Sequence, residues 1–582
     1  MERRSFMKLA GSAGMSAVVL QHSPLPVNAA TREESPDMFI DKDILEDRNQ
    51  NRSTVVCQNG IVCTSQPLAS MAGIDILKAG GNAIDAAICA NAVLSVVEPM
   101  SCGPGGDLFA IVWVEKEKKL YGLNASGRSP YDWSLSDVET LGLQEIPTYG
   151  PLSWSVPGCV SGWEALRQKF GTSNLNDLLA AAVHYARDGF PVSPIIARSW
   201  KRVDATKHPT LGKTYAPGGK IPEFGDVFAN PDMAAFLETL ARDGAAAFYE
   251  GEIAERIVAF SQANGGRFSL RDFHDHTVTW VDPVSSSYRG HDVWELPPNG
   301  QGIAALQILN ILENFDIPSL QPNSAEQLHL LIEAKKLAFE DRAVYYADMD
   351  FADVPLMRLI SKEYAKERAG LIDPAHASQR VVPGKLGGPS DTVYLTAADK
   401  DGNMISLIQS IYYGFGSQVV PDNLGFALQN RGQLFSLNPD HRNKLEPHKR
   451  PFHTIIPGFV TQEGQPLFSF GVMGGDFQPQ GHAQVLMNMI DFGMSPQQAG
   501  EQPRVAHFES STPTGDEMSG DGRVGLERHI PQKIRSALAD MGHEIFAEVG
   551  AFGGYQGVWR KPDPRRYFGG SDSRKDGCAI GY

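Results

Sequence analysis

The sequence predicts a layered α+β fold, chiefly from the order of its hydrophobic patterns. Residues 160–345 are mainly helical in pattern, with regular apolar spacing over 303–312 and 328–338. After a glycine- and proline-rich linker at 383–390, the pattern changes to the period typical of strands. A helical region followed by a cluster of strands favours helices layered against sheets.

Length, composition and charge narrow the function classes. The 582 residues suffice for several domains or one large interleaved fold. Hydrophobic residues make up 42% and charged residues 21%, so the chain can bury a large core. The net charge of −16 disfavours nucleic acid as a partner. Beyond the N-terminal segment, no run is long and apolar enough to span a membrane.

Residues 1–30 are interpreted as a removable export signal of the twin-arginine type. Arg3 and Arg4 precede a mildly apolar stretch, Leu9 to Leu20, which is shorter than the roughly 20 residues that span a bilayer. Small residues at Ala29-Ala30 suit cleavage. An unstructured basic tail is the alternative. We therefore expect export to the periplasm or the medium, and a mature chain that opens with a polar arm at 33–53.

The first mature elements have clear signals. Gly80-Gly81 ends a helical pattern in the way a glycine C-cap does. The next helix is apolar almost all round, which predicts that it is buried. Gly103-Pro104-Gly105-Gly106 lacks the Lys-Ser/Thr ending of a P-loop and is predicted to be a tight turn. We expect strands at 54–57, 61–63 and 108–114, and helices at 68–79 and 83–97.

After the linker, two strands at 392–398 and 404–411 are joined by Asp399-Lys400-Asp401-Gly402, which is strong hairpin chemistry. If the turn is the three residues 400–402, Thr392 lies opposite Ser410. A one-residue change in the turn would place Gln409 or Ile411 there instead. Further strands are expected at 453–460 and 466–472, and a helix from about 484 to 492.

The junction at Asp391-Thr392 fits self-cleavage. A glycine-rich linker ends abruptly at a hydroxyl residue that opens a core strand. The Thr392 hydroxyl would attack the Asp391 carbonyl, and water would then release Thr392 as a new N-terminus. Its α-amino group, with an ordinary pKa of about 7.7–8, can then accept the hydroxyl proton. On the residues alone, a linker that serves only as a connector remains an equal alternative.

Two further features suit acyl transfer through Thr392. Ser410 is placed to orient the Thr392 hydroxyl by a hydrogen bond. Gly474-Gly475 lies between a strand and a helix, where backbone N–H groups can approach an oxyanion closely. Most such glycine pairs are only turns. No complete Gly-x-Ser-x-Gly motif supports a serine-hydrolase elbow.

Other reactive side chains carry weaker signals. The six cysteines are scattered and form no disulfide framework, although Cys57 and Cys63 could pair in an oxidising compartment. His274 and His276 look like a metal pair but lack further ligands at suitable spacing, so we expect neither metal nor cofactor. His482 follows the glycine pair, where lining the site and packing at a helix start are equally plausible.

Several segments together resemble γ-glutamyltransferases over nearly the whole mature chain. The run from Thr392 to Asn403 resembles the start of the small subunit of that family, and Met473-Gly474-Gly475 matches its Pro-Gly-Gly oxyanion segment. The other matching segments are 69–99, including Gly80 to Ala87, Val156-Pro157-Gly158, Pro297-Pro298 to Leu312, Glu333 to Asp348, and Lys449-Arg450-Pro451.

The resemblance implies a four-layer αββα N-terminal-nucleophile fold built from two chains of one proenzyme. The large chain would be 31–391 and the small chain 392–582, and the two would stay associated. Thr392 would be the nucleophile, Ser410 the assisting hydroxyl, and Gly474 and Gly475 the oxyanion hole.

The sequence departs from the family where γ-glutamyl donors are held. Ser126 stands in place of the arginine that binds the donor's α-carboxylate, with Arg128 two residues later. Leu434 replaces the aspartate that binds the α-amino group. His453-Thr454 replaces paired serines, and the lid segment is short, with only 437–448 between Ser436 and Lys449.

These departures predict a changed acyl donor, because each lost charged partner costs a γ-glutamyl group about 2–5 kcal/mol. Arg431 or Arg128 would bind a carboxylate instead, since a guanidinium binds one bidentately. We take Asn430, His453 and Thr454 as further substrate-binding candidates.

The expected enzyme is a self-processing N-terminal-threonine amidohydrolase or acyltransferase. It would cleave a small-molecule amide or peptide that carries a small carboxylate-bearing acyl group, through an acyl-enzyme. A true γ-glutamyl transferase or glutathione hydrolase is one alternative. An inactive, unprocessed binding protein is the other, and the presence of Thr392, Ser410 and Gly474-Gly475 argues against it.

Overall fold

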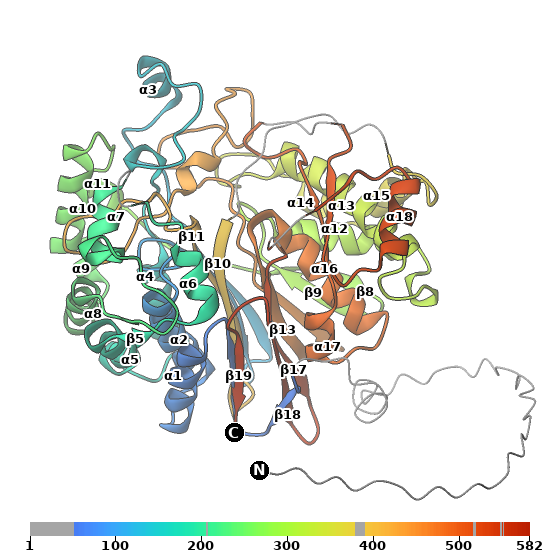
Figure 1. The fold of residues 1–582 in the computed structure, drawn as a ribbon, viewed down its shortest axis with the longest axis horizontal. Helices are drawn as coiled ribbons and strands as arrows, with labels where there is room; N and C mark the ends of the chain where they lie inside the picture. Colours follow the sequence, from blue (N-terminus) through green and yellow to red (C-terminus); the bar gives the residue numbers. More distant parts are fainter. Residues whose placement is uncertain (1–51, 205–207, 379–389, 516–519, 548–549, 551) are drawn as a thin grey trace, which may run out of the picture.

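The computed structural model describes residues 52–582 except 205–207, 379–389, 516–519, 548–549 and 551. The expected export signal, nearly all of the polar arm and the linker before Ser390 therefore lie outside the described residues. Two seven-stranded sheets lie face to face, and helices cover both outer faces (Figure 1). This confirms the α+β prediction and the αββα layering that the family resemblance implies.

The first sheet contains the strand that begins at the candidate nucleophile. β10 lies at its centre, between β2 and β11, and all neighbouring strands are antiparallel. The strand order is β19 (Cys578–Gly581), β2 (Ile61–Thr64), β10 (Ser390–Ala398), β11 (Met404–Tyr413), β3 (Asp107–Val114), β4 (Lys119–Ala125) and β7 (Thr279–Val281).

The second sheet faces the first across a layer of buried side chains. Its order is β1 (Val55–Cys57), β18 (Arg566–Ser571), β17 (Gly554–Lys561), β13 (Gln465–Met473), β12 (Gly458–Gln462), β9 (His291–Glu295) and β8 (Val284–Tyr288). Each sheet combines strands from before and after Thr392. The two expected chains therefore interleave in both sheets, and neither could form its core without the other.

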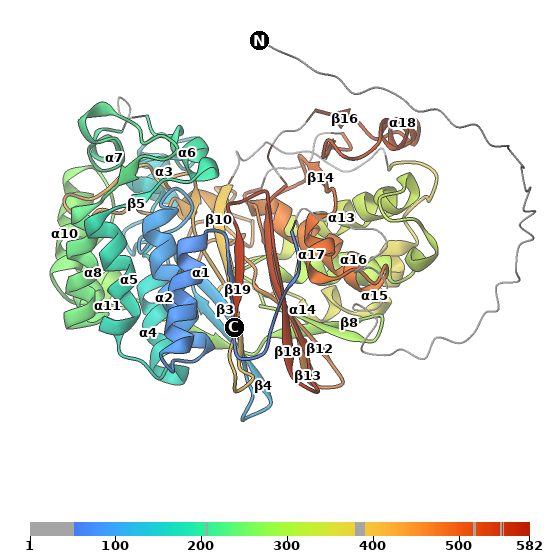
Figure 2. The same ribbon diagram turned by 60° about the horizontal axis from the view of Figure 1, so that its bottom comes forward.

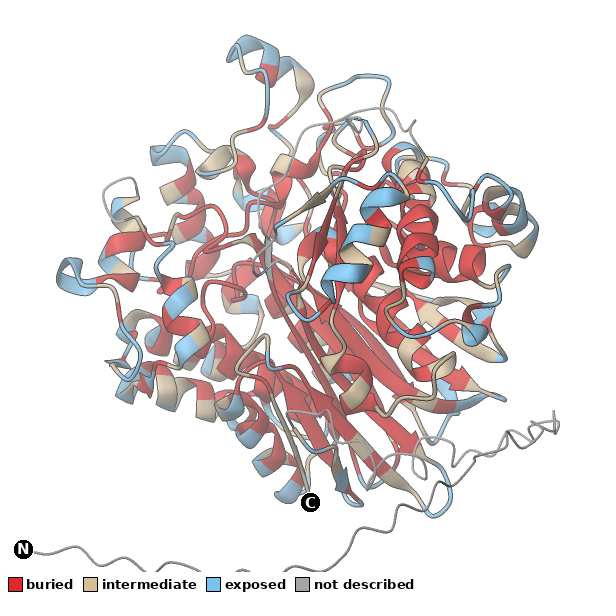
Figure 3. Cartoon of the chain, turned by 45° about the vertical axis from the view of Figure 1, so that its right-hand side comes forward, coloured by how far each residue is buried: buried red, intermediate tan, exposed pale blue. Residues whose placement is uncertain are grey.

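The alternation of side chains along the strands explains the layers. In β3, Leu108, Ala110 and Val112 pack against helices, whereas Phe109, Ile111 and Trp113 point towards the second sheet. Successive strand residues point to opposite faces, so a strand that is apolar at every position is buried on both faces. Figure 3 shows this burial along the central strands.

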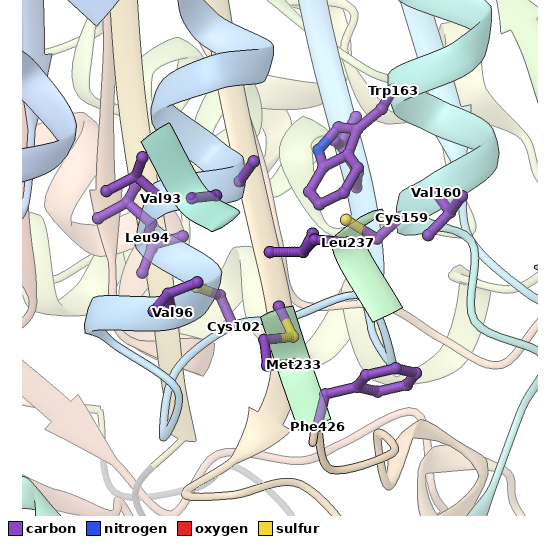
Figure 4. Packing of buried hydrophobic residues seen from close by; sticks show 14 of the residues in the cluster. Val93, Leu94, Val96, Cys102, Cys159, Val160, Trp163, Met233, Leu237 and Phe426 are labelled. Atoms are coloured by element: carbon purple, nitrogen blue, oxygen red, sulfur yellow. The ribbon is translucent and has the colours of Figure 1, made fainter. Parts of the chain in front are cut away.

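The helices on the first sheet include α1 (Pro67–Lys78) and α2 (Ala83–Val97). The Gly81 and Gly80 amides donate to Ile76 and Leu77, which is the Schellman pattern that ends α1. Every residue of α2 is buried, as its apolar sequence predicts. Figure 4 shows Val93 and Leu94 in the same cluster as Trp163 of α4 (Cys159–Phe170) and Leu237 of α8 (Pro231–Asp243). Figure 2 shows these helices on one side of the sheets.

The opposite outer face carries α12 (Gly302–Leu312), α13 (Ala325–Tyr345), α16 (Gln478–Ile490) and α17 (Pro496–Glu501). No helix among the described residues is long and apolar enough to cross a membrane. The remaining elements are α3 (Leu135–Thr140), α5 (Leu175–Asp188), α6 (Pro194–Trp200), α7 (Pro209–Tyr215), α9 (Ala246–Tyr249), α10 (Glu252–Ala263), α11 (Leu270–His274), α14 (Leu356–Leu359), α15 (Lys362–Ala369), α18 (Gln532–Asp540), β5 (Phe190–Pro191), β6 (Val227–Phe228), β14 (Val505–Phe508), β15 (Arg523–Leu526) and β16 (Ile545–Phe546).

Three sequence predictions need correction. The mainly helical region 160–345 also contains the short strands β5 to β9, of which β8, with three consecutive serines, shows no alternating pattern. The strand expected at 453–460 is β12, which begins only at Gly458. The helix expected from 484 is α16, which begins at Gln478 because Pro479 suits the first helical turn. The remaining strands and helices named in the sequence lie within a few residues of their expected bounds.

Candidate active site

Thr392 lies near the start of β10, on the side facing the second sheet, and its side chain is 1% exposed. Its hydroxyl donates a hydrogen bond to Ser410 Oγ at 3.3 Å. The pairing of Val393 with Gln409 fixes the register that places Thr392 opposite Ser410, as a three-residue turn predicts. The ladder shifts between Asp391 and Val393, so the expected scissile bond coincides with an irregularity in the strand.

Ser410 joins Thr392 to a buried arginine. Ser410 Oγ accepts hydrogen bonds from Arg431 Nη2 at 3.0 Å and from the Tyr412 amide at 2.8 Å. The left-handed backbone of Tyr412, with φ of 78°, bends the end of β11 around this oxygen. Arg431 opens a short 3-10 helix, Arg431–Leu434, and its guanidinium lies 4.4 Å from the Tyr412 ring centre.

Arg431 is fully buried, yet no described carboxylate lies within ion-pair distance of it. Its remaining side-chain contact is Nη1 to Thr454 Oγ1 at 2.7 Å, and Nε has no hydrogen-bond partner among the described residues. Burial lowers the pKa of Arg431 to about 10, so it stays charged at neutral pH. A buried guanidinium with an N–H group that lacks a partner can donate a further hydrogen bond to an anion.

His453 lies next to this cluster but is held by the protein itself. Its Nε2 bonds to Asp107 Oδ2 at 3.1 Å, and its Nδ1 accepts from the Ile455 amide at 3.3 Å. Burial, and then the nearby Arg431 charge, lower its pKa to about 4, so the ring is neutral. Asp107 also accepts from the Gly127 and Gly158 amides and from a glutamine side chain. Sequence reasoning missed Asp107, which only its position after Gly105-Gly106 could have suggested.

Of the other binding candidates, only Thr454 is bonded to Arg431, and the Asn430 and Arg128 side chains bond to other groups. Thr454 bonds to Arg431, whereas the Asn430 side chain bonds to the Thr148 carbonyl and the Tyr413 amide. Arg128 donates to the Thr277 carbonyl at 3.4 Å and approaches Asp350 at 3.7 Å, so it is not bonded to the Thr392 cluster. Of the two arginines considered from sequence, the structure brings only Arg431 to Ser410.

The residues at the departures from the family are apolar or already bonded. Leu434 is 7% exposed and belongs to the apolar cluster that includes Tyr412. Ser126 is buried, and its hydroxyl donates to Asn124 at 2.7 Å. In the short lid segment, Ser436 and Asn443 are joined by a backbone hydrogen bond. No ionic partner for an α-amino group is found at position 434.

Gly474 and Gly475 follow β13 in the left-handed region, with φ of 126° and 57°. Among the described residues, neither amide donates a hydrogen bond to a protein group. Backbone amides without acceptors at a turn of this kind suit an oxyanion hole. The Gly475 carbonyl, in contrast, is bonded to Gln301, a residue that the sequence did not single out.

His482 lies elsewhere and is buried against Glu295 at 2.7 Å, which favours the packing interpretation. His274 is exposed beside Asp275, and His276 bonds to Ser161. The described cysteines are all free thiols, including Cys57 and Cys63, which bond to separate carbonyls.

One buried group of potential metal ligands, His329, Glu333 and His543, lies within the described residues. The two imidazoles bond to each other at 2.8 Å, and Glu333 pairs with Lys336 at 2.8 Å. Most of these ligand atoms are thus already hydrogen-bonded, His543 Nδ1 being the exception among the described residues, and the lysine would repel a cation.

Comparison with known proteins now identifies the family. The family model described as Gamma-glutamyltranspeptidase matches residues 69–582. The chain belongs to the γ-glutamyltranspeptidase family. It is 39% identical to the glutathione hydrolase-like YwrD proenzyme of Bacillus subtilis, over 91% of this chain and 99% of that protein. It is 34% identical to the oxamate amidohydrolase proenzyme of Klebsiella pneumoniae, over 91% and 100%.

The solved structures agree. Cephalosporin acylase from Bacillus halodurans superposes with a TM-score of 0.84 at 42% identity, covering 93% of this chain and 99% of that one. These relatives are hydrolases, and those compared by sequence carry proenzyme names. The protein is therefore an N-terminal nucleophile hydrolase of a self-processing family.

Proposed function

We propose that this γ-glutamyltranspeptidase-family enzyme cleaves itself at Asp391–Thr392 and then hydrolyses amides of small carboxylate-bearing acyl groups. Arg431 carries the proposal. Among the described residues, the fully buried Arg431 guanidinium has two hydroxyl partners and no carboxylate within ion-pair distance. It thus lacks a direct counter-ion there, whereas buried charges are normally paired. A substrate carboxylate would supply that counter-ion beside the nucleophile.

In the proposed reaction, Thr392 is the general base through its α-amino group and the nucleophile through its hydroxyl. Its α-amino group takes the hydroxyl proton while Oγ attacks the amide carbonyl, and the amides of Gly474 and Gly475 stabilise the oxyanion. The C–N bond breaks, the amine leaves with the proton, and an ester remains on Thr392. Water then attacks the ester and gives a proton to the α-amino group, which passes it to Thr392 Oγ as the ester C–O bond breaks and the carboxylic acid is released.

Ser410 has a positioning role in this scheme. Its oxygen accepts from Thr392, from the Tyr412 amide and from Arg431. The Tyr412 amide and Arg431 fix Ser410, which in turn fixes the Thr392 hydroxyl for attack. The positive guanidinium near the new N-terminus also disfavours protonation of the α-amino group, which keeps more of it as the free base.

Leu434 supports a donor without an α-amino group. An ammonium buried against an apolar side chain would lose hydration and gain no ionic partner. Glutaryl amides, and smaller ones such as oxamate, have the carboxylate but lack that ammonium. The names of the relatives, which include a cephalosporin acylase and an oxamate amidohydrolase, are in keeping with this class.

Intact mass tests the processing step. Purified wild type is expected to give two fragments, the smaller running from Thr392 to Tyr582, and Thr392→Ala is expected to remain one chain. A Thr392→Ala variant that still splits at this bond would contradict the mechanism. A wild type that stays whole and inactive would identify a binding protein instead.

Paired anilides test the acyl group. We expect glutaryl anilide to be hydrolysed faster than γ-glutamyl anilide, which differs only in its α-amino group. A γ-glutamyl preference of tenfold or more, about 1.4 kcal/mol, would restore the ordinary glutathione-type activity.

A further inference from the structure

We propose that Gln301 and Arg342 form a positioning pair that holds the Gly474-Gly475 loop in the shape an oxyanion hole needs. The inference rests on the proposed function, since it takes these two glycines as the oxyanion donors. Neither residue bonds to Thr392 or Ser410 in the structure. Their effect on catalysis would therefore pass through the backbone of the loop.

Gln301 connects two backbone segments of the site. It occupies the N-cap position of α12, without a side-chain capping hydrogen bond, and is fully buried. Its Nε2 donates to the Gly475 carbonyl at 2.8 Å and to the Thr454 carbonyl at 2.7 Å. Thr454 is the residue whose hydroxyl accepts from Arg431. One amide group thus ties the oxyanion loop to the segment that supports the proposed carboxylate site.

Arg342 fixes Gln301 in that orientation. Arg342 Nη1 donates to Gln301 Oε1 at 2.6 Å, so the Gln301 amide nitrogen must face the two carbonyls. The same nitrogen donates to Asp476 Oδ1 at 2.7 Å, and Asp476 directly follows Gly475. The guanidinium lies 3.8 Å from the ring centre of Phe339 and is 1% exposed, so it has little freedom to move.

Two side-chain contacts hold the loop around Gly475. Gln301 donates to the Gly475 carbonyl, and Arg342 donates to the side chain of the next residue, Asp476. The Gly474 carbonyl accepts from the Phe477 amide at 3.0 Å. Because the Gly475 N–H belongs to the same trans peptide, it points away from that carbonyl. Gln301 then fixes the next peptide through the Gly475 carbonyl. Glycines at φ of 126° and 57° have many alternative conformations, so external contacts must select this one.

Gln301→Glu is the decisive variant. Glutamate is close to glutamine in size, and its carboxylate pairs with Arg342, so the variant should fold. It lacks the N–H group that donates to the Gly475 and Thr454 carbonyls. We expect kcat on glutaryl anilide to fall by about 10-fold to 100-fold with KM changed less than about threefold. This is somewhat less than the loss of a whole oxyanion donor. Arg342→Met should act in the same direction, and Arg342→Lys should recover part of the rate.

A boronic acid that carries the glutaryl side chain provides the second readout. Its tetrahedral adduct with Thr392 places an oxygen in the oxyanion hole, whereas free glutarate competes only for the acyl pocket. We expect Gln301→Glu to weaken boronate inhibition by a factor similar to the loss in kcat and to leave glutarate inhibition nearly unchanged. A purely structural defect would weaken both equally.

The matched control is Arg289→Met. Arg289 bonds to Asp491 and to the Phe315 carbonyl, away from the glycine loop, and should leave kcat unchanged. Wild-type kcat in folded Gln301→Glu, or equal losses of boronate and glutarate affinity, would overturn the inference. Full activity in Thr392→Ala would instead overturn the proposed function, so the two failures are distinguishable.

Discussion

Arg431 and Arg504 are both buried arginines, but among the described residues only Arg504 has a carboxylate within ion-pair distance. Arg504 donates to Asp572 at 2.8 Å and to the Gly500 and Phe552 carbonyls. Arg431 donates to two hydroxyls and to no described carboxylate. The pKa of each is lowered to about 10, chiefly by burial, and at Arg504 also by the neighbouring charge of Arg574.

The difference separates a structural arginine from one prepared for a ligand. At Arg504 the folded chain supplies the counter-ion, so the ion pair contributes to holding the small-chain segments together. At Arg431 the described hydrogen-bond acceptors are neutral hydroxyls, and the carboxylates of Asp107 and Asp476 offset the cost of burial only from a distance. Retaining such a charge makes physical sense when an anionic substrate offsets it during catalysis.

The largest expected effect is a loss of stability on removing the structural arginine, Arg504. Arg504→Met removes a partner of buried Asp572, which then relies on Arg574 at 3.1 Å. We expect the free energy of unfolding to fall by about 3 kcal/mol, near the lower end for breaking a buried ion pair. Arg431→Met should leave stability unchanged or raise it. Urea denaturation of both variants measures this, and an equal loss in both would abolish the distinction.

A smaller effect is expected at the hydroxyl that supports Arg431. Thr454→Val removes the acceptor of Nη1, and a hydrogen bond to a charged group is worth about 1.5–3 kcal/mol. We expect kcat/KM for glutaryl anilide to fall by about 10-fold to 100-fold, mainly through KM.

Thr461→Val is the matched control for that prediction. Thr461 is a buried threonine that accepts from Trp294 at 2.9 Å, away from Arg431. It should keep KM at the wild-type value. A rise in KM of the same size in both variants would show that Thr454 acts only through packing.

The smallest expected effect concerns pH. The pKa of His453 is lowered to about 4 in the folded protein, against about 6.5 when unfolded. The unfolded chain therefore takes up the proton first, and stability is lost as pH falls from about 6.5 towards 4. At pH 5.5 this one histidine accounts for about 1.4 kcal/mol relative to pH 7.5.

Denaturation at both pH values tests this account. His453→Gln should reduce the pH dependence by that amount, because glutamine does not titrate. His274→Gln is the control, since His274 is exposed and its pairing with Asp275 raises its pKa, so its removal should not reduce the loss of stability at low pH. An unchanged pH dependence in His453→Gln would mean that the pKa of His453 is the same in the folded and unfolded protein.

The sequence predicted the parts of the molecule that depend on local pattern. The three-residue turn, one of the alternatives open from the sequence, places Thr392 opposite Ser410, and the almost continuous apolar run of 83–97 predicted the buried helix α2. It missed β8, because a run of three serines between Val284 and Tyr288 shows no alternation.

The missed parts of the site depend on contacts between residues far apart in the chain. Asp107 meets His453 across 346 positions, and Gln301 meets Gly475 across 174. No local rule reports such pairs. For the same reason, Arg431 and Arg128 were equal candidates until the fold placed one of them at Ser410.

The central claim is that Arg431 binds the substrate carboxylate. The most direct test removes each of these two groups separately and then both together. Wild type and Arg431→Met are each assayed on glutaryl anilide and on pentanoyl anilide, which lacks the carboxylate. We predict that wild type prefers the glutaryl donor by at least about tenfold in kcat/KM, or about 1.4 kcal/mol, and that Arg431→Met loses this preference while still hydrolysing the pentanoyl donor. An equal preference in both proteins would contradict the assignment of Arg431 as the carboxylate site.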